Sequence, residues 1–143
     1  MVHREFLVIV EFFMLLVQTK LGLSKIQGIG LFADQHISKG SLIWKFRPYF
    51  DLCVEKCKIL SLSEPAKLQF LRYAYLNSQT NMYVLCFDDA RYFNHSDNPN
   101  CKTIESLDDK EGVEIAGKDI QKGEELTVNY KEYDAEYNYK MSI

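Results

Sequence analysis

The sequence is poor in residues that cross-link a chain or ligate a metal. It has four cysteines and no Cys-x-x-Cys pair, and no histidine or further cysteine lies at metal-ligand spacing from Cys53 and Cys57. This pattern argues against a disulfide framework and against a cysteine-rich zinc module. We therefore expect reduced, mostly buried thiols and an intracellular chain.

The chain also lacks a strong charge of one sign and a long apolar run. Its net charge of −3 disfavours direct binding to nucleic acid and suits a basic partner such as a lysine-rich peptide. The apolar run from Phe6 to Val17 is interrupted by Glu11 and spans roughly 12 residues, too few to cross a bilayer. No signal-peptide cleavage site follows it. We expect no membrane segment and interpret residues 1–13 as an extension, with Met14 as an alternative natural start.

What the sequence does contain is enough apolar residues for one core, arranged in short runs. Of its 143 residues, 47% are hydrophobic, which fits a single domain. Turn residues separate the runs, which occupy residues 15–17, 30–33, 42–46, 82–87, 113–116 and 126–130. Short apolar runs separated by turn residues are typical of short strands and predict a mainly β domain.

Two similar turns and an acidic segment divide these runs. Residues 37–40 are Ile-Ser-Lys-Gly and residues 120–123 are Ile-Gln-Lys-Gly, and each turn leads into an expected strand. The acidic segment at residues 105–111 predicts an exposed hairpin loop.

One helix is predicted from Glu64 to about Asn77. Ser63 can cap its first turn, and Pro65 suits the first helical positions because the missing N–H has no partner there. The apolar face of this helix is expected to contain Leu68, Leu71 and Tyr75.

Residues 91–101 form the most unusual segment of the chain. Asparagine, aspartate, serine and proline gather behind an aromatic pair, which predicts an ordered, non-repetitive loop of the kind that carries function. Asn94-His95-Ser96 also fits a glycosylation sequon, but that would require secretion. His95-Ser96-Asp97 contains the residue types of a hydrolase triad, but consecutive side chains diverge and cannot form a proton relay.

A glycine motif at residues 28–33, Gly-x-Gly-x-x-Ala, overlaps the fingerprint of dinucleotide sites. That fingerprint must open a helix within a βαβ unit. Only residues 34–36 precede the next turn, so no such helix fits and a dinucleotide is disfavoured. A glycine turn that lies against another ligand is expected instead.

A third motif, Gly123-Glu-Glu-Leu-Thr-Val-Asn-Tyr130, ends a strand-like run in a tyrosine, which in isolation would suggest a core residue.

Taken in order, the Gly-x-Gly turn, Asn94-His-Ser-x-x-Pro-Asn-Cys101 and this motif resemble the SET-domain lysine methyltransferases, over roughly residues 14–133. The short chain is similar to minimal bacterial and viral members without flanking zinc modules. The resemblance implies a mainly β (β-clip) fold of short curved sheets with one short helix. In that fold a C-terminal pseudoknot brings residues 94–95 beside Tyr130.

The resemblance also implies the cofactor and the residues that hold it. The backbone around Ile29, Gly30 and Phe32 would contact S-adenosylmethionine, together with Asn94 and His95. Tyr130 would be the active-site tyrosine and a further cofactor contact.

Methyl transfer to a lysine needs a positioned, neutral amine, and an apolar aromatic channel lowers the pKa of such an amine. Aromatic rings also attract methylated cations. The candidates for the channel are Tyr83, Tyr92, Val128, Tyr133, Tyr137 and Tyr139. Val128 stands where many members hold an aromatic residue that limits the number of methyl groups, so product multiplicity stays open.

The chain departs from the zinc-binding members of the family at Asp97, where those members carry cysteine, and no cysteine follows Cys101. No metal is therefore expected, and the tyrosine-rich tail at residues 134–143 is expected to cover the site instead. Asn129 replaces the commoner aspartate.

The implied substrate is a lysine of a protein or peptide, such as a histone, and the chain would act as a monomer or homodimer. The compartment would be cytoplasmic in a bacterium and nuclear in a eukaryotic or viral setting. Two alternatives stay open. One is a catalytically inactive SET-like interaction module, and the other is methylation of a small-molecule amine.

Overall fold

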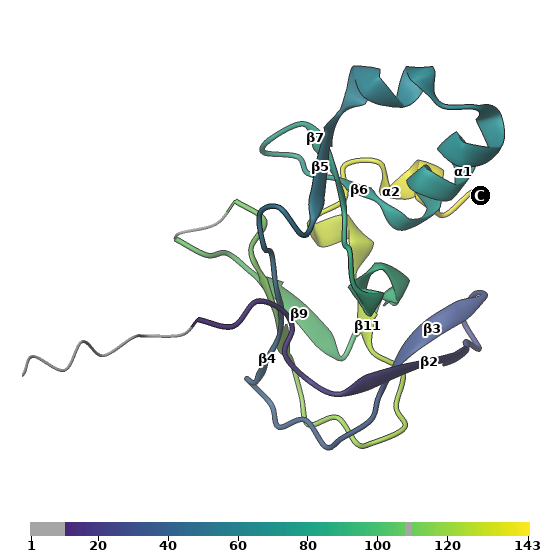
Figure 1. Ribbon diagram of the computed structural model, residues 1–143. Helices are drawn as coiled ribbons and strands as arrows, with labels where there is room; N and C mark the ends of the chain where they lie inside the picture. The colour runs from purple at the N-terminus through teal and green to yellow at the C-terminus, as the bar shows by residue number, and fades with distance from the viewer. Residues whose placement is uncertain (1–10, 108–109) are drawn as a thin grey trace, which may run out of the picture.

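Residues 11–107 and 110–143 are described by the computed structural model (Figure 1). In this part of the chain the strands form four small sheets. The largest has the order β1 (Met14–Leu15), β4 (Leu42–Lys45), β10 (Val113–Ala116) and β9 (Cys101–Ile104). A second has the order β5 (Leu52–Glu55), β7 (Met82–Leu85) and β6 (Tyr75–Leu76), and two pairs complete the set, β2 (Thr19–Leu23) with β3 (Ile29–Ala33) and β8 (Asn94–His95) with β11 (Thr127–Val128). The mainly β prediction is confirmed, whereas residues 1–10 of the predicted extension lie outside the described residues.

The helices are short and lie mostly in one half of the molecule. They comprise α1 (Glu64–Tyr73), α2 (Tyr137–Lys140) and the 3-10 segments η1 (Lys56–Ser61), η2 (Asp89–Tyr92) and η3 (Tyr130–Glu132). Figure 1 shows α1 and α2 beside the β5–β7–β6 sheet. Strands β2, β3, β4 and β9 lie in the other half of the molecule, and β11 lies between the two halves. Within the described residues, no helix is both long and apolar enough to cross a membrane.

Helix α1 begins where the sequence predicts and ends earlier. The Ala66 N–H donates to Ser63 Oγ at 3.4 Å, so the predicted cap is present. The prediction that the helix continues to about Asn77 is wrong, because Tyr75 and Leu76 pair with β7. Strand pairing thus outweighs local helix propensity at this end and removes Tyr75 from the helical face.

The two similar turns meet in space. Ile37 and Ile120 exchange backbone hydrogen bonds of 2.9 and 2.8 Å. Gly40 and Gly123 adopt φ angles of +85° and +94°, a region that favours glycine. The repeated sequence therefore marks a pair of turns that lie side by side.

The hairpin predicted at residues 105–111 is confirmed. It joins β9 to β10, which pair antiparallel from Val113 with Ile104 to Ala116 with Cys101. Residues 108–109 of the loop lie outside the described residues.

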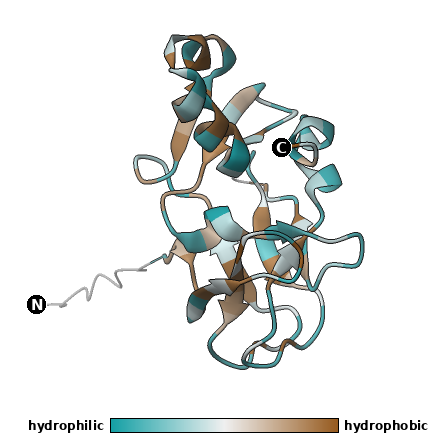
Figure 2. Cartoon of the chain, turned by 90° about the vertical axis from the view of Figure 1, so that its right-hand side faces the viewer, coloured by the Kyte–Doolittle hydropathy of each residue, from teal (hydrophilic) through white to brown (hydrophobic). Residues whose placement is uncertain are grey.

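The core falls into two clusters of buried side chains. The larger one includes Leu31, Ile43, Leu126 and Val128, and the smaller one lies between α1 and the β5–β7–β6 sheet. Figure 2 shows that apolar residues concentrate on the strands of both halves.

The cysteines divide equally between the surface and the core. Cys86 and Cys101 are buried as expected, but the expectation of burial is wrong for Cys53 and Cys57, which are exposed. No residue of β5, which contains Cys53, is buried, and in η1, which contains Cys57, only Ile59 is buried.

Candidate active site

The parallel pair β8–β11 brings two of the sequence motifs together. Thr127 lies opposite Asn94, and Val128 lies opposite His95. The buried Asn100 side chain fixes this arrangement: its Oδ1 accepts from the Thr127 N–H at 2.9 Å, and its Nδ2 donates to the Glu125 carbonyl at 2.8 Å. The amide side chain of Asn100 therefore ties the loop at residues 91–101 to the motif at residues 123–130.

Asn94 joins these two motifs to the glycine turn. Its Nδ2 lies 3.1 Å from the Gln27 carbonyl oxygen, 3.3 Å from the Ile29 carbonyl oxygen and 2.8 Å from Glu125 Oε1. A Cβ atom on Gly30 would collide with the Glu125 carboxylate. The glycine turn therefore needs Gly30 because a side chain from the third motif approaches its backbone closely.

His95 positions the backbone of Tyr130. Its Nδ1 accepts from the Tyr130 N–H at 3.1 Å, and its Nε2 lies 3.3 Å from Asp97 Oδ1. Since Nδ1 accepts a hydrogen bond, the proton of the neutral ring belongs on Nε2 and is directed at Asp97. Ser96 Oγ accepts from the Asn98 N–H instead, so the three consecutive residues do not form a hydrolase relay.

Tyr130 begins η3 and is held by both its backbone and its hydroxyl. The hydroxyl donates to the Phe93 carbonyl at 2.6 Å, and the ring is buried. Burial raises the pKa of Tyr130 above its ordinary value. The group therefore remains a protonated hydroxyl that can orient a ligand by hydrogen bonding.

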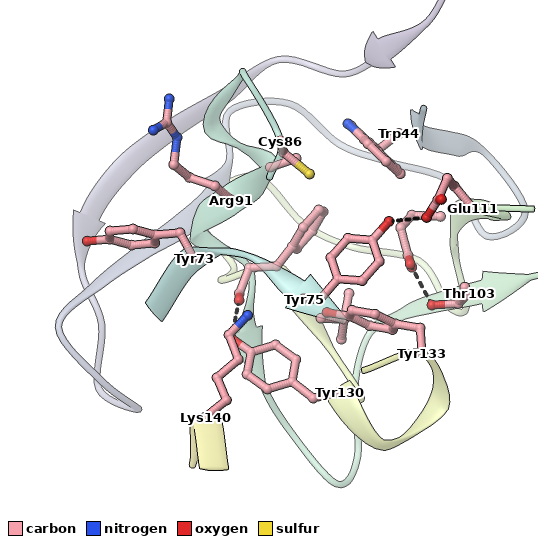
Figure 3. A pocket seen from close by; sticks show the side chains of 14 residues that line it. Trp44, Tyr73, Tyr75, Cys86, Arg91, Thr103, Glu111, Tyr130, Tyr133 and Lys140 are labelled. Carbon is pink, nitrogen blue, oxygen red and sulfur yellow. Dashed lines mark hydrogen bonds between the residues drawn. The ribbon is translucent and has the colours of Figure 1, made fainter. Parts of the chain in front are cut away.

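Two cavities meet at Tyr130. A larger cleft of about 440 Å³ is lined by the glycine turn at 27–29, by Tyr92 and Asn94, and by Ile143 of the tail. A smaller, aromatic cavity of about 40 Å³ lies beside it (Figure 3). Five residues line both cavities: Tyr73, Arg91, Phe93, Tyr130 and Lys140. These shared residues form the boundary between the two cavities.

Of the residues predicted to contact the cofactor, the larger cleft brings three together. Ile29, Asn94 and Tyr130 line it. Gly30 and Phe32 are not among the described residues that line this cleft, because Gly30 faces Glu125 and the Phe32 ring faces Gly22. His95 acts from behind Tyr130, through the hydrogen bond to its backbone.

The residues predicted for the channel separate into different places. Val128 and Tyr133 line the smaller cavity, and Tyr92 lines the larger cleft. Tyr137 lies beside His95, with 6.4 Å between ring centroids.

Tyr83 and Tyr139 lie apart from both cavities. They border a small hollow in the second core, where the Tyr83 ring packs on Phe70 and its hydroxyl donates to Glu136 at 2.6 Å. The strand pleat explains the placement of Tyr83, because neighbouring residues of β7 face opposite sides of their sheet, whereas Tyr139 lies in α2.

Several residues of the smaller cavity were not identified from the sequence. Tyr75 packs edge-on against Tyr133 at 5.0 Å and donates its hydroxyl to Glu111 at 2.8 Å. Trp44 and Glu114 enter from the two neighbouring strands β4 and β10. A glutamate between two apolar residues of an expected strand is the sequence signal that could have indicated this site.

The smaller cavity also collects polar atoms that have no hydrogen-bond partner among the described residues. These buried atoms are Trp44 Nε1, Arg91 Nε and Glu114 Oε2, and all three residues line the cavity. The other carboxylate oxygen of Glu114 accepts from Thr103 Oγ1 at 2.5 Å. Because buried polar groups are normally paired, this cavity has the chemistry of a site for a polar ligand.

Glu114 should make stability depend on pH. Burial raises the pKa of its carboxyl from 4.5 to about 7. The folded protein holds this proton more tightly than the unfolded chain, so the stabilisation is complete below pH 4.5 and is lost as the pH rises through 7. Glu114→Gln, which needs no proton, should gain up to about 3 kcal/mol relative to the wild type between pH 5 and pH 8. Urea unfolding at both pH values measures this gain.

The exposed Glu105 provides the control for this measurement. Glu105→Gln should change the free energy of unfolding equally at both pH values. A Glu114→Gln difference that is also independent of pH would contradict the assignment of a buried, protonated carboxyl.

Comparisons with known proteins show which family the chain is similar to. A family model described as SET domain matches residues 28–131. The Histone-lysine N-methyltransferase trr of Drosophila melanogaster is 33% identical over 120 residues, which cover 76% of this chain and 4% of that protein. The chain thus spans a small part of the length of this curated relative.

Solved structures support the fold. A Plasmodium falciparum protein named as a candidate histone methyltransferase superposes with a TM-score of 0.53 at 22% identity, over 80% of this chain and 93% of that one. A chain of a humanized mutant of the Chaetomium thermophilum Polycomb repressive complex 2 gives a TM-score of 0.55 at 23% identity, over 83% of this chain and 15% of that one. The predicted fold class is confirmed.

Proposed function

The chain belongs to the SET-domain family, and we propose that it transfers a methyl group from S-adenosylmethionine to a lysine side chain of a protein. The observation that carries the proposal is the position of Tyr130, whose ring lines both the larger cleft and the aromatic cavity. A cofactor in the first and a lysine side chain in the second would meet at this residue.

The larger cleft suits a cofactor with a carboxylate and a nearby positive charge. Arg91 presents a buried Nε that has no partner in the described part of the chain, and its Nη2 donates to the Phe87 carbonyl at 2.8 Å. Arg91 would pair with the carboxylate, and the backbone at Ile29 and the amide of Asn94 would flank the amino end. Bound there, S-adenosylmethionine would supply an electrophilic methyl group on a sulfonium.

The smaller cavity suits the stem and amine of a lysine. Tyr75, Tyr130 and Tyr133 present aromatic surface, which favours the aliphatic stem and disfavours a charged amine. The Tyr130 hydroxyl would orient the amine, and positioning of this kind is the main catalytic requirement of a direct displacement. Above pH 7, where the Glu114 carboxyl ionises, its Oε2 would accept a hydrogen bond from the amine before transfer.

We further propose that residues 14–133 form the catalytic unit and that residues 134–143 close its cleft. In support, Gln27 Nε2 donates to the Ile143 carbonyl at 3.2 Å, which links the tail to the glycine turn. Asp134 accepts from the Leu76 N–H at 3.1 Å, which ties the tail to β6 beside the aromatic cavity.

Calorimetry and mass spectrometry test the proposal on the full chain. We expect S-adenosylmethionine to bind with a stoichiometry of one, because one larger cleft contains the predicted contacts. A lysine-rich histone peptide incubated with enzyme and cofactor should gain 14 Da per methyl group, and peptides with arginine in place of lysine should gain nothing. Cofactor binding without transfer to any lysine peptide would favour an inactive interaction module, and absence of binding would overturn the proposal.

A further inference from the structure

Lys140 places a lysine side chain of the chain's own tail inside the proposed site. It ends α2, its side chain is 11% exposed, and it lines both cavities. Its Nζ lies 4.8 Å from the centroid of the Tyr130 ring. Figure 3 shows the Lys140 stem running up beside Tyr130.

The environment of the Lys140 amine is that of an acceptor amine. Nζ donates to the Ala74 carbonyl at 2.9 Å and forms a longer ion pair of 3.8 Å with Asp134 Oδ2. It also lies over the Tyr130 ring. Burial lowers the pKa of Lys140 below its ordinary value, which favours the neutral form that a nucleophilic amine requires.

Lys131 shows how an ordinary lysine in the same region differs. It lies just past Tyr130 and is half-exposed, and its Nζ forms a 2.8 Å ion pair with Asp97. This pair raises the pKa of Lys131 and holds its amine in the charged form. The pKa values of the two lysines after Tyr130 are thus shifted in opposite directions. Of these two lysines, only Lys140 lines the cavities.

We propose that Lys140 is a self-methylation site, at which the tail presents its own amine to Tyr130. The inference rests on the proposed function, which supplies a sulfonium methyl donor. The Nζ lone pair would form the new nitrogen–carbon bond while the methyl–sulfur bond breaks. Its electron pair would remain on sulfur as a neutral thioether, and one amine proton would leave to solvent. A protein substrate would have to displace this amine, so self-methylation and substrate methylation compete.

Mass spectrometry of the full chain is the first test. After incubation with S-adenosylmethionine, peptide mapping should find the methyl group on Lys140 and leave Lys131 unmodified. The rate per molecule should be unchanged over a 100-fold dilution of the protein, because the amine and the site belong to one chain. Lys140→Arg, which keeps a cation beside Asp134, should abolish the modification.

Trp44 provides a second test that needs no cofactor. It is the single tryptophan of the chain and lines the smaller cavity, so its emission reports what occupies that cavity. Lys140→Ala removes the stem and amine, and n-butylamine has the length of that stem. We expect n-butylamine to change Trp44 emission in Lys140→Ala at concentrations at least tenfold lower than in the wild type.

The outcomes separate this inference from the proposed function. If a histone peptide is methylated while Lys140 is not, the inference fails and the proposed function stands. Modification spread over exposed lysines, or a rate that falls on dilution, overturns it as well. Equal n-butylamine titrations of the two proteins would show that Lys140 does not hold the acceptor position. If neither Lys140 nor any peptide is methylated, the proposed function fails and the inference fails with it.

Discussion

Tyr130→Phe is expected to lower the rate constant for methyl transfer roughly 100-fold, with cofactor affinity changed by no more than a few-fold. The substitution keeps the ring that lines both cavities and removes the hydroxyl that donates to the Phe93 carbonyl. An amine without this hydroxyl beside it would sample more orientations, whereas the displacement requires a single orientation of the amine. Single-turnover methylation of a histone peptide measures the rate, and calorimetry measures the affinity.

Tyr83→Phe is the matched control for this prediction. It also removes a tyrosine hydroxyl with a 2.6 Å hydrogen bond, but the partner is Glu136 and the Tyr83 ring lies in the second core. Both variants should lose about 1 kcal/mol of stability, since each loses one hydrogen bond. Only Tyr130→Phe should lose activity. Equal rates in both variants would remove Tyr130 from the proposed chemistry.

The sequence predicted the features that depend on contacts between residues close together in the chain. Ser63 caps α1, Gly40 and Gly123 take up left-handed turns, and Ser96 Oγ accepts from the Asn98 N–H within the loop at residues 91–101. These features depend on contacts a few residues apart, so composition and spacing were sufficient to predict them. The three spaced motifs added the fold through their resemblance to a family.

Long-range pairing decided what the sequence left open. Tyr75 fits a helical face by spacing, but its pairing with Val84 of β7 turns it toward Tyr133. Tyr83, one position before Val84, therefore faces the opposite side of the sheet and packs on Phe70. The tyrosines are alike in type, and only the register of distant strands determines which of them line a cavity.

The charged residues of the site escaped prediction for a related reason. Glu114 follows Val113 in a strand that could face either way, and Lys140 lies in a four-residue helix too short for a periodic signal. Their roles depend on which side of each element is covered. That is set by residues far away in the chain, such as Trp44 opposite Glu114 and Ala74 beside Lys140.

Asn94→Asp is expected to reduce cofactor affinity at least 100-fold at pH 7.5 and to destabilise the fold by about 3 kcal/mol. The change is nearly isosteric, but Nδ2 is the donor that joins Gln27, Ile29 and Glu125. A carboxylate at the same place would face two carbonyl oxygens and the Glu125 carboxylate, all of which are acceptors. The glycine turn would then move away from β8, and the larger cleft would lose its shape.

Acidification should partly reverse this loss, and that reversal identifies its cause. Two carboxylates in contact share a proton at low pH, so one of them becomes a donor and the repulsion falls. The cofactor affinity of Asn94→Asp should therefore recover at least tenfold between pH 7.5 and pH 5.5 relative to the wild type at each pH. Asn98→Asp places the same charge on the exposed side of the same loop and should bind the cofactor like the wild type at both pH values. A defect in Asn94→Asp that is the same at both pH values would mean that lost packing, rather than the reversed polarity of this one side chain, controls the cleft.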